Sequence, residues 1–397
     1  MIMKNKCIII GVSGGIAAYK ICSLVSSLHK QGNEVHVLMT KGAEQFVSPL
    51  TFQTLSGNRV VRDIFSLDEN PEVHHIALAA KADAFVIAPA TGNTIAKVAN
   101  GIADDMLTAT FLAATCPKLI VPAMNVHMLE NPVTQDNLEK CRGYGIHVMD
   151  SAEGWLACGD TGKGRMPEAD EIEDAIASII ETDRYLEGKK VLITAGPTQE
   201  ALDPVRYLTN HSSGKMGYAL ARAARNRGAE VTLVSGKTNL KTPFGVNRVD
   251  VTSAADMADA VLSCSDMQDV IIMSAAIADY TPETVAENKI KKQEGEFVLP
   301  LKRTTDILKE LGAGKKEGQI LIGFAMETED LIKNAEGKLA KKNADYIIAN
   351  SINEKGAGFA VDTNSVTIIS REKKWSVGLL SKDDTAEEIL DYCVKGK

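Results

Sequence analysis

The chain has 397 residues, a hydrophobic content of 45% and a formal net charge of −8. This length is too great for one ordinary domain, and the hydrophobic content is typical of globular proteins, so the sequence predicts two or three compact domains. The acidic balance argues against a general nucleic-acid binder, although a few local lysines could still hold a small anionic substrate.

The first half of the chain alternates strand-like and helix-like segments. It opens with the apolar run Cys7–Val12, typical of a strand buried on both faces of a sheet, and a helical pattern follows through Ile16 and Leu24. Further strands are predicted at 34–39, 84–88, 118–122 and 146–149, with helical stretches between them and a closing helix at 168–181. Strands that alternate with helices predict a parallel, doubly wound sheet.

The same pattern restarts in the second half. The charged, glycine-containing segment 183–190 is predicted to be a linker, and 190–196 reads as a second opening strand and turn. A helix is expected at 216–227, strands at 230–234, 270–273 and 346–350, and at 365–380 an alternating end of the kind found in antiparallel strands. The sequence therefore predicts an α/β protein of two consecutive doubly wound, mainly parallel, Rossmann-like domains, 1–188 and 189–397.

Both opening strands run into glycine-bearing turns, where backbone amides and a helix N-terminus suit phosphate. The first turn, Gly11–Gly15, does not satisfy the dinucleotide fingerprint, and neither second strand ends in the acidic residue that would hold a ribose. The stretch from Ser212 lacks the first glycine of a P-loop and has Met216 where that loop binds metal. Two NAD-binding domains and a P-loop are thus disfavoured, while tight packing of the glycines remains an alternative to phosphate binding.

Several strings in the first half resemble one family of flavoproteins. Gly11–Lys20 resembles the flavin-phosphate turn of the flavin-containing cysteine decarboxylases, which include phosphopantothenoylcysteine decarboxylase and the peptidyl-cysteine decarboxylases of lantibiotic synthesis. Pro89–Thr94 is similar to their second FMN segment and Pro122–Asn125 to their substrate motif. Ala157–Asp160, followed by Gly164–Met166, is similar to their substrate clamp. The resemblance implies a flavodoxin-like first domain that binds FMN.

The second half resembles phosphopantothenate–cysteine ligase. The resemblance lies in four strings, which are Thr194–Thr198, Asp203–Arg206, Asn210–Gly217 and Lys289–Lys292. The order of the two halves is that of the bacterial fusion proteins of coenzyme A synthesis. The resemblance implies CTP-dependent joining of 4'-phosphopantothenate to cysteine through an acyl-cytidylate, with Mg²⁺ accompanying CTP. It then implies FMN-dependent decarboxylation of the phosphopantothenoylcysteine so formed.

For the decarboxylase, the resemblance implies three catalytic residues. His75, chosen over its neighbour His74, is the candidate base, because histidine titrates near neutral pH. Asn125 would donate its amide to the substrate carboxylate, although an Asx turn at a strand end is the simpler reading. Cys158 would protonate the product, although most free cysteines are merely buried. The residues implied around FMN are Gly11, Ser13, Gly14, Gly15, Thr40, Thr91, Asn93 and Thr108.

For the ligase, the resemblance implies that lysines neutralise the triphosphate. Lys338 and Lys342 share a helix face at a spacing of four, and Lys289 belongs to a lysine cluster; by composition alone, a solvated face would be the simpler reading. Asn210 is expected to contact the acyl-cytidylate, with an N-cap as the alternative. The nucleotide-binding residues implied are Ser274, Ala275, Asp279, Lys289, Thr305, Asp306, Ile307, Leu308, Phe324, Lys338 and Lys342, of which Phe324 could equally be ordinary core. The metal ligands are not assigned.

Two other functions remain alternatives. Relatives of the flavin domain act as non-catalytic regulatory subunits, but these lack the ligase half; an NAD-dependent oxidoreductase is disfavoured by the missing ribose-binding acids. No run of about 18 apolar residues is present, so no membrane span is expected. The seven cysteines include no Cys-x-x-Cys pair, which favours a reducing, cytoplasmic location. The family resemblance also implies a homo-oligomer, with trimeric flavin domains and dimeric ligase domains that together form a dodecamer.

Overall fold

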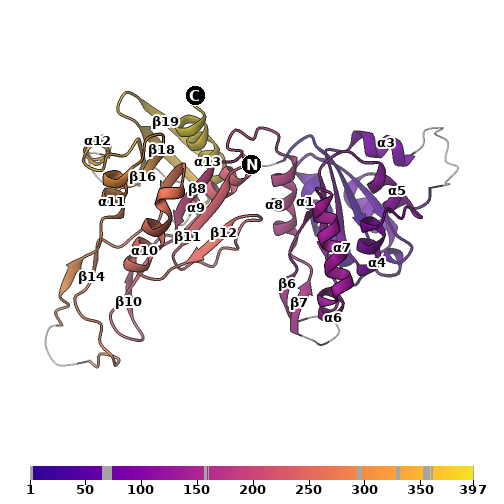
Figure 1. Cartoon of the computed structure of the whole chain (residues 1–397), viewed down its shortest axis with the longest axis horizontal. Coiled ribbons are helices and arrows are strands. Elements are labelled where there is room, and N and C mark those ends of the chain that lie inside the picture. The colour runs from indigo at the N-terminus through magenta and orange to yellow at the C-terminus, as the bar shows by residue number, and fades with distance from the viewer. Residues whose placement is uncertain are drawn as a thin grey trace. The chain divides into compact units, whose positions relative to one another are not determined.

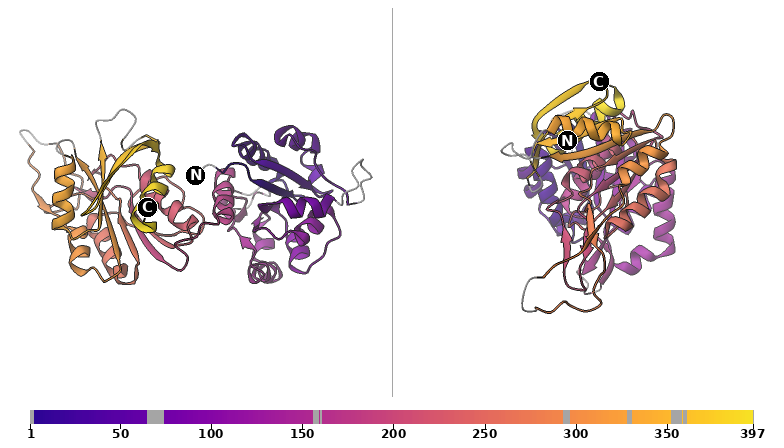
Figure 2. Two further views of the ribbon diagram at one scale, coloured as in Figure 1. Left: turned by 90° about the horizontal axis from the view of Figure 1, so that it is seen from above. Right: turned by 90° about the vertical axis from the view of Figure 1, so that its left-hand side faces the viewer.

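The computed structural model describes residues 3–64, 74–155, 159, 161–292, 297–327, 331–351, 358 and 361–396. The chain folds into two compact units, Ile2–Glu181 and Thr182–Lys397, drawn in Figures 1 and 2. No helix among the described residues is long and apolar enough to cross a membrane.

The first unit is built on a five-stranded parallel sheet with the order β2-β1-β3-β4-β5. Its strands are β1 (Cys7–Val12), β2 (Glu34–Met39), β3 (Ala84–Ala90), β4 (Lys118–Pro122) and β5 (His147–Val148). The central strands β1 and β3 are buried along their whole length, which explains their unbroken apolar sequences. This strand order is that of flavodoxin-like sheets, so the predicted fold of the first half is confirmed.

Helices cover both faces of this sheet. They are α1 (Ala18–Lys30), α2 (Pro49–Ser56), α3 (His74–Lys81), α4 (Gly92–Ala99), α5 (Met106–Ala113), α6 (Val126–Glu130), α7 (Pro132–Gly143) and α8 (Ala169–Ile180). Helices α1 and α8 pack together, while α3, α4, α5 and α7 bury one shared cluster against the sheet. The rings of Phe85 on β3 and Phe111 on α5 meet edge to face at 5.0 Å in that cluster.

The second unit contains an eight-stranded sheet with the order β12-β11-β8-β13-β16-β17-β18-β19. Its strands are β8 (Lys190–Ala195), β11 (Glu230–Ser235), β12 (Asn247–Asp250), β13 (Val270–Met273), β16 (Ile320–Glu327), β17 (Tyr346–Ser351), β18 (Thr363–Ile369) and β19 (Lys374–Ser381). The first six in spatial order pair in parallel, and β18 and β19 pair antiparallel. The Rossmann-like second domain and its antiparallel end are as predicted.

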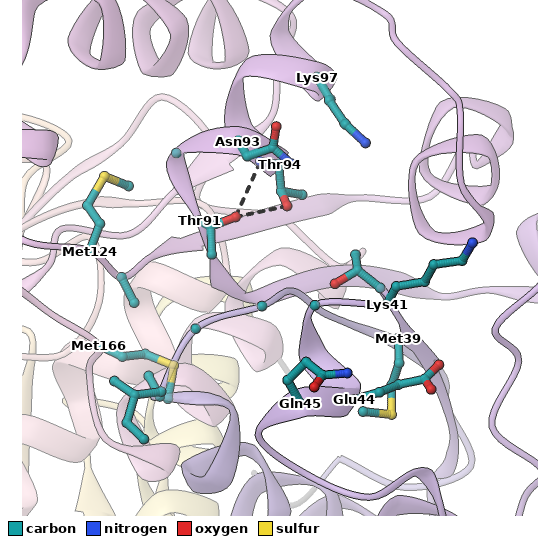
Figure 3. Close-up of a pocket in the computed structure, with 18 of the residues that line it drawn as sticks. Met39, Lys41, Glu44, Gln45, Thr91, Asn93, Thr94, Lys97, Met124 and Met166 are labelled. Atoms are coloured by element: carbon teal, nitrogen blue, oxygen red, sulfur yellow. Dashed lines mark hydrogen bonds between the residues drawn. The ribbon is translucent and has the colours of Figure 1, made fainter.

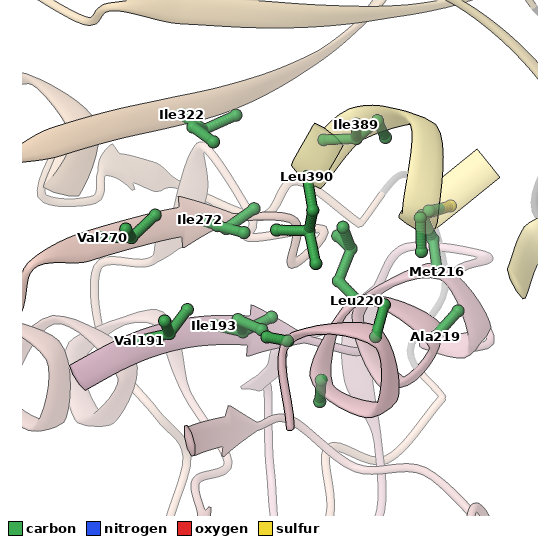
Figure 4. Close-up of a cluster of buried hydrophobic side chains, with 14 of the residues drawn as sticks. Val191, Ile193, Met216, Ala219, Leu220, Val270, Ile272, Ile322, Ile389 and Leu390 are labelled. Carbon is green, nitrogen blue, oxygen red and sulfur yellow. The ribbon is translucent and has the colours of Figure 1, made fainter. Parts of the chain in front are cut away.

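The α-helices that flank the second sheet in the described part of this unit are α9 (Lys215–Asn226), α10 (Ala254–Cys264), α11 (Ile307–Gly314), α12 (Leu331–Lys341) and α13 (Lys382–Leu390). Because neighbouring residues of a strand face opposite ways, Ile193 packs toward α9 and α13 while Leu192 packs toward α10, α11 and α12. Figure 4 shows Leu220 of α9 and Leu390 of α13 beside Ile193 and Ile272 of the sheet.

Short antiparallel hairpins extend from both sheets. They are β6 (Ala152–Trp155) with β7 (Thr161–Arg165), β9 (Gln199–Ala201) with β10 (Tyr207–Thr209), and β14 (Tyr280–Pro282) with β15 (Leu301–Arg303). Figure 1 shows β10 and β14 reaching away from the large sheet of their unit. Strands of three to five residues carry too little periodicity to be recognised, and none of the hairpins was predicted.

The segment 183–190, predicted as a linker from its charge, packs against the second unit. Leu186 is 1% exposed and belongs to the core of that unit. Arg227 pairs with Asp183 at 3.4 Å and lies 5.6 Å from the centre of the Tyr185 ring. The two compact units therefore divide between residues 181 and 182, a few residues before the predicted boundary.

Candidate functional site

A large cavity opens at the carboxyl ends of the strands of the first sheet. Its volume is about 1730 Å³, and the loops after β1, β2, β3 and β4 all contribute to its lining. These loops converge because the carboxyl ends of parallel strands lie at one edge, where ligands of open α/β sheets bind. Figure 3 draws the residues around this cavity.

One end of the cavity is a polar cradle of close backbone turns. A Cβ atom on Gly14 would lie 2.8 Å from the carbonyl carbon of Gly42, so only glycine lets the loops after β1 and β2 approach this closely. Thr91 is the N-cap of α4 and accepts a hydrogen bond from the Thr94 N–H at 3.4 Å. The first turn of α4 lines the cavity, which is an arrangement that suits an anion.

The lining of the cavity also contains many sulfur atoms. Met39, Met106, Met124, Met128 and Met166 all contribute to it, and in Figure 3 Met124 and Met166 lie on one side while Met39 lies on the other, beside Lys41. Methionine side chains adapt to flat aromatic surfaces. A cavity lined by adaptable methionine side chains and by a polar cradle fits a ligand that carries both an aromatic ring system and a phosphate.

Charged side chains of both signs line the cavity. Lys97 donates to Asp104 at 2.7 Å; this hydrogen bond raises the pKa of Lys97 and lowers that of Asp104. Lys20 pairs with Glu168 at 2.9 Å, and this contact, with Arg165 beside it, lowers the pKa of Glu168. Lys97 and Lys20 at the cavity are therefore already paired with acids, so the backbone cradle is the main candidate for binding a phosphate.

Five of the eight residues expected around FMN line the cavity: Gly14, Gly15, Thr40, Thr91 and Asn93. The other three lie beneath it. A Cβ on Gly11, inside β1, would come within 3.0 Å of Leu107. The buried Ser13 hydroxyl donates to the Pro89 carbonyl at 2.6 Å and accepts from the Thr91 N–H at 3.0 Å. Thr108 is buried in the capping box of α5.

The expected decarboxylase residues fall into three different places. Asn125 lines the cavity and is also the N-cap of α6, accepting from the His127 N–H at 2.9 Å, so the Asx-type role foreseen as its alternative is present. His75 lies half-buried on α3 and is not among the residues that line the cavity. Cys158 lies outside the described residues, between β6 and β7.

The β6–β7 hairpin is docked directly beside Asn125. The Met124 N–H donates to the Gly164 carbonyl at 3.0 Å, and a Cβ on Gly164 would collide with the Met124 carbonyl. The sequence analysis compared this glycine-rich stretch with a substrate clamp and did not assign Trp155 or Lys97 to the site, although both line the cavity. The spacing of four between Asn93 and Lys97, which places both on one face of α4, is a signal that could have found the lysine.

A second polar edge lies at the carboxyl ends of β8 and β13 in the other unit. The Ala275 N–H donates to the Thr194 hydroxyl at 3.1 Å, and the Asn210 side-chain amide donates to the Ala276 carbonyl at 3.0 Å. Asn210 is not an N-cap, because α9 is capped by Gly214. The structure thus brings Asn210 together with the loop that carries Ser274, Ala275 and Asp279.

The same edge continues toward α11 and α12. Thr304 is connected to this polar edge by a hydrogen bond from its N–H to the Asp279 carbonyl at 3.0 Å. Asp306, after the exposed Thr305, caps α11 and forms an ion pair with the Lys342 ammonium; Lys338 lies one turn earlier on α12 and is half-buried. Of the other expected contacts, Ile307 is buried, Leu308 and Phe324 pack against the core, and Lys289 is exposed on the segment after β14.

Comparison with known proteins covers both units. The family described as "Flavoprotein" matches residues 2–181, and the family described as "DNA/pantothenate metabolism flavoprotein C-terminal domain" matches residues 186–396. The chain is 52% identical over 395 residues to the "Coenzyme A biosynthesis bifunctional protein CoaBC" of Bacillus subtilis (strain 168), covering 98% of this chain and 96% of that protein. It is 44% identical over 390 residues to the protein of the same name from Vibrio cholerae serotype O1 (strain ATCC 39315 / El Tor Inaba N16961), covering 98% of both.

A third relative has a different name. It is a "Cysteine/Cysteine sulfinic acid decarboxylase" from an unknown prokaryotic organism, 45% identical over 350 residues, and the match covers 87% of this chain and 98% of that protein. The two named bifunctional relatives match over nearly their full length, and each unit of this chain matches its own family description. The chain therefore belongs to the family of coenzyme A biosynthesis bifunctional proteins.

Proposed function

We propose that the chain makes 4'-phosphopantetheine from 4'-phosphopantothenate and cysteine, in a CTP-dependent ligation followed by a decarboxylation. The observation that carries this proposal is the identity of 52% that extends over 98% of the chain to a bifunctional protein of coenzyme A biosynthesis. The presence of one polar carboxyl edge in each unit supports it, because two reactions need two sites. We assign the decarboxylase to residues 1–188 and the ligase to residues 189–397.

In the ligation, a carboxylate oxygen of 4'-phosphopantothenate would attack the α-phosphorus of CTP, and diphosphate would leave. The amine of cysteine would then attack the acyl carbon, and CMP would leave. Lys289, Lys338 and Lys342 would neutralise the triphosphate, with Mg²⁺ bound to its oxygens. Asn210 would donate to the acyl-cytidylate, for which its place beside the loop of Ala275 and Asp279 is suitable.

The first unit fits FMN. The close turns at Gly14, the first turn of α4 and the methionine side chains of the cavity match a phosphate joined to a flat ring system. When bound, FMN would take electrons from the thiol-bearing carbon of phosphopantothenoylcysteine and return them after carbon dioxide is lost. Asn125 would hold the substrate carboxylate, and Cys158 would supply a proton to the product.

His75 needs a further condition to act as the base. It lies on α3 and does not contribute to the cavity of its own chain. Its catalytic role therefore requires a neighbouring copy of the chain to place it at the site, in agreement with the expected homo-oligomer. We propose trimeric flavin domains and dimeric ligase domains in a cytoplasmic dodecamer, which sedimentation and scattering measurements of the purified protein would test.

The decisive experiment supplies the purified protein with 4'-phosphopantothenate, cysteine, CTP and Mg²⁺ and identifies the products by mass. We expect 4'-phosphopantetheine, CMP and diphosphate, with no product when CTP is omitted. Flavin released by denaturation should be identified as FMN. Free cysteine, supplied without the other substrates, is the control that separates this proposal from the cysteine decarboxylase activity in the name of the third relative. If free cysteine loses carbon dioxide as fast as phosphopantothenoylcysteine does, the proposal is wrong.

A further inference from the structure

The segment that carries Lys289 has no regular structure of its own. Residues 283–292 lie outside the helices and strands, and Lys289, Lys291 and Lys292 are exposed. Holding such a segment in one conformation costs about 1–2 kcal/mol per residue in backbone entropy, so its position depends on contacts with its surroundings. The Ala286 N–H donates to the Leu202 carbonyl at 3.0 Å. The next contact is made at Ile290, directly after Lys289.

Ile290 is held at both of its backbone groups. Its N–H donates to Asp203 Oδ2 at 3.1 Å, and its carbonyl accepts from Arg206 Nη2 at 2.8 Å. That N–H belongs to the peptide that joins Ile290 to Lys289, and this planar unit includes the Lys289 Cα, so holding it in place also holds the point from which the Lys289 side chain leaves the backbone. Asp203 and Arg206 thus hold the backbone beside the exposed lysine in place through Ile290.

The Asp203 carboxylate is held rigidly by its surroundings. Its side chain is wholly buried, and its carboxylate accepts five hydrogen bonds: from the N–H groups of Val205 and Arg206 at 2.8 Å each, from Arg206 Nε at 3.1 Å and Nη2 at 2.6 Å, and from Ile290. These contacts, with the Arg206 side chain first, hold the pKa of Asp203 far below its usual range. The residue is therefore a permanent anion and a rigid acceptor at neutral pH.

The same turn leads directly to the other candidate ligase residue. Leu202 and Arg206 close the β9–β10 turn through a backbone bond of 2.9 Å, and Thr209 at the end of β10 donates to the Thr198 carbonyl at 2.8 Å. Asn210 follows immediately. One rigid turn therefore supports Asn210 through the chain and Lys289 through hydrogen bonds.

We propose that Asp203, with Arg206, is a positioning residue that holds Lys289 at the ligase edge in the orientation needed to bind a nucleoside triphosphate. This inference rests on the proposed ligation and on the role of Lys289 in it. Asp203 acts through the lysine, so its removal should matter only while the lysine is present.

A double-mutant cycle in the full-length protein tests this dependence, with the variants Asp203→Asn, Lys289→Gln and the combination. Asparagine keeps the shape of Asp203 but loses the charge and one acceptor. We expect Asp203→Asn to lower kcat/KM for CTP by at least about tenfold, mainly through KM. In the Lys289→Gln background the same change should have less than about a twofold effect. Independent, multiplying effects would overturn the proposal, as would normal kinetics of Asp203→Asn.

Two readouts separate positioning from loss of folding. Decarboxylation of supplied phosphopantothenoylcysteine, in the other unit, should be unchanged. Brief trypsin treatment of Asp203→Asn should increase cleavage after Lys289, Lys291 and Lys292 alone, measured by mass spectrometry. If the whole second unit becomes sensitive, Arg206→Lys replaces Asp203→Asn in the cycle. Lysine keeps a positive charge beside Asp203 but cannot make the forked contact with Asp203 and the hydrogen bond to the Ile290 carbonyl at the same time.

Asp269→Asn is the matched control. Asp269 also accepts a backbone N–H, from Lys190 at 2.8 Å, and pairs with Lys189 at 2.9 Å, but it lies at the amino ends of β8 and β13. Asp269→Asn should leave the kcat/KM for CTP unchanged. A loss of kcat/KM equal to that of Asp203→Asn would assign the effect to general stability and overturn the proposal.

Ligation by the wild-type protein shows whether the proposed function holds. A normal Lys289→Gln variant of an active wild type would refute the assigned role of Lys289, and the positioning role with it, while leaving the proposed ligation in place.

Discussion

Asp306 and Lys342 connect the beginning of α11 to the end of α12. The carboxylate of Asp306 accepts from the Lys309 N–H at 3.1 Å as the N-cap of α11, and it also pairs with the Lys342 ammonium. One side chain therefore caps the first turn of α11 and also partly neutralises a lysine that is expected to bind the triphosphate.

The two roles of Asp306 can be separated by substitution. Asp306→Asn keeps a good capping residue and removes the ion pair, whereas Asp306→Ala removes both. We expect the alanine variant to be about 1 kcal/mol less stable than the asparagine variant, measured by urea unfolding of the second unit. Equal stabilities would show that the cap contributes nothing to this helix.

Asn125→Asp should separate helix capping from substrate binding. Aspartate can cap α6 through the His127 N–H as asparagine does, so folding and flavin content should be unchanged. A negative charge beside the substrate carboxylate should reduce decarboxylation by at least about 100-fold. Asn131→Asp is the control, because Asn131 caps α7 in the same way and does not line the cavity. Retained decarboxylation in Asn125→Asp would remove Asn125 from the proposed site.

Gly14→Ala should abolish flavin binding by forcing two loops apart. The added Cβ would lie 2.8 Å from the backbone of Gly42, and neither loop can move without disturbing the cradle. Gly143→Ala, where no atom lies within 4 Å of the added Cβ, should bind flavin normally. The flavin-to-protein absorbance ratio measures both. Normal flavin content in Gly14→Ala would mean that the cradle is not the phosphate site.

Gly15→Ala gives a complementary result. Its Cβ would meet Thr91 Cγ2 at an ordinary 3.6 Å, so the protein itself has room for it. A loss of flavin affinity with unchanged thermal stability would then report a close approach of the ligand to this residue. Unchanged affinity would place the ligand elsewhere in the cavity.

The compact units predict where the chain can be cut. A fragment 182–397 should be more stable than a fragment 189–397, because only the longer one retains Leu186 in the core and Asp183 beside Arg227. Burial of one leucine contributes about 1.5–3 kcal/mol, so the difference should appear clearly in urea unfolding. Equal stability would mean that these residues serve only as a connection. Fragment 1–181 should still bind FMN.

Much of the fold could be predicted because buried parallel strands are continuous apolar runs. The bounds of β1, β2, β4 and β13 agree with the prediction, whereas β16 was not predicted, since Gly323 interrupts its pattern. The linker at 183–190 was misjudged because the charges that suggested exposure flank Leu186, which is buried.

The site was harder to predict than the fold. Which loops meet depends on strand order, and neither the closeness of Gly14 to Gly42 nor that of Asp306 to Lys342 is visible in the sequence. The placement of His75 away from the cavity likewise depends on the three-dimensional position of α3. The assigned roles of these residues stay predictions until the variants are measured.

The packing of α13 on α9 has a consequence for how the protein is made. Ile389 and Leu390 of α13 close the core over Leu220 of α9, yet the ribosome makes α9 long before it makes α13. While the second unit is still being synthesised, the apolar side of α9 has no cover from α13. A nascent chain that stops before Lys382 would keep this surface exposed and become a target for chaperones, proteases or aggregation.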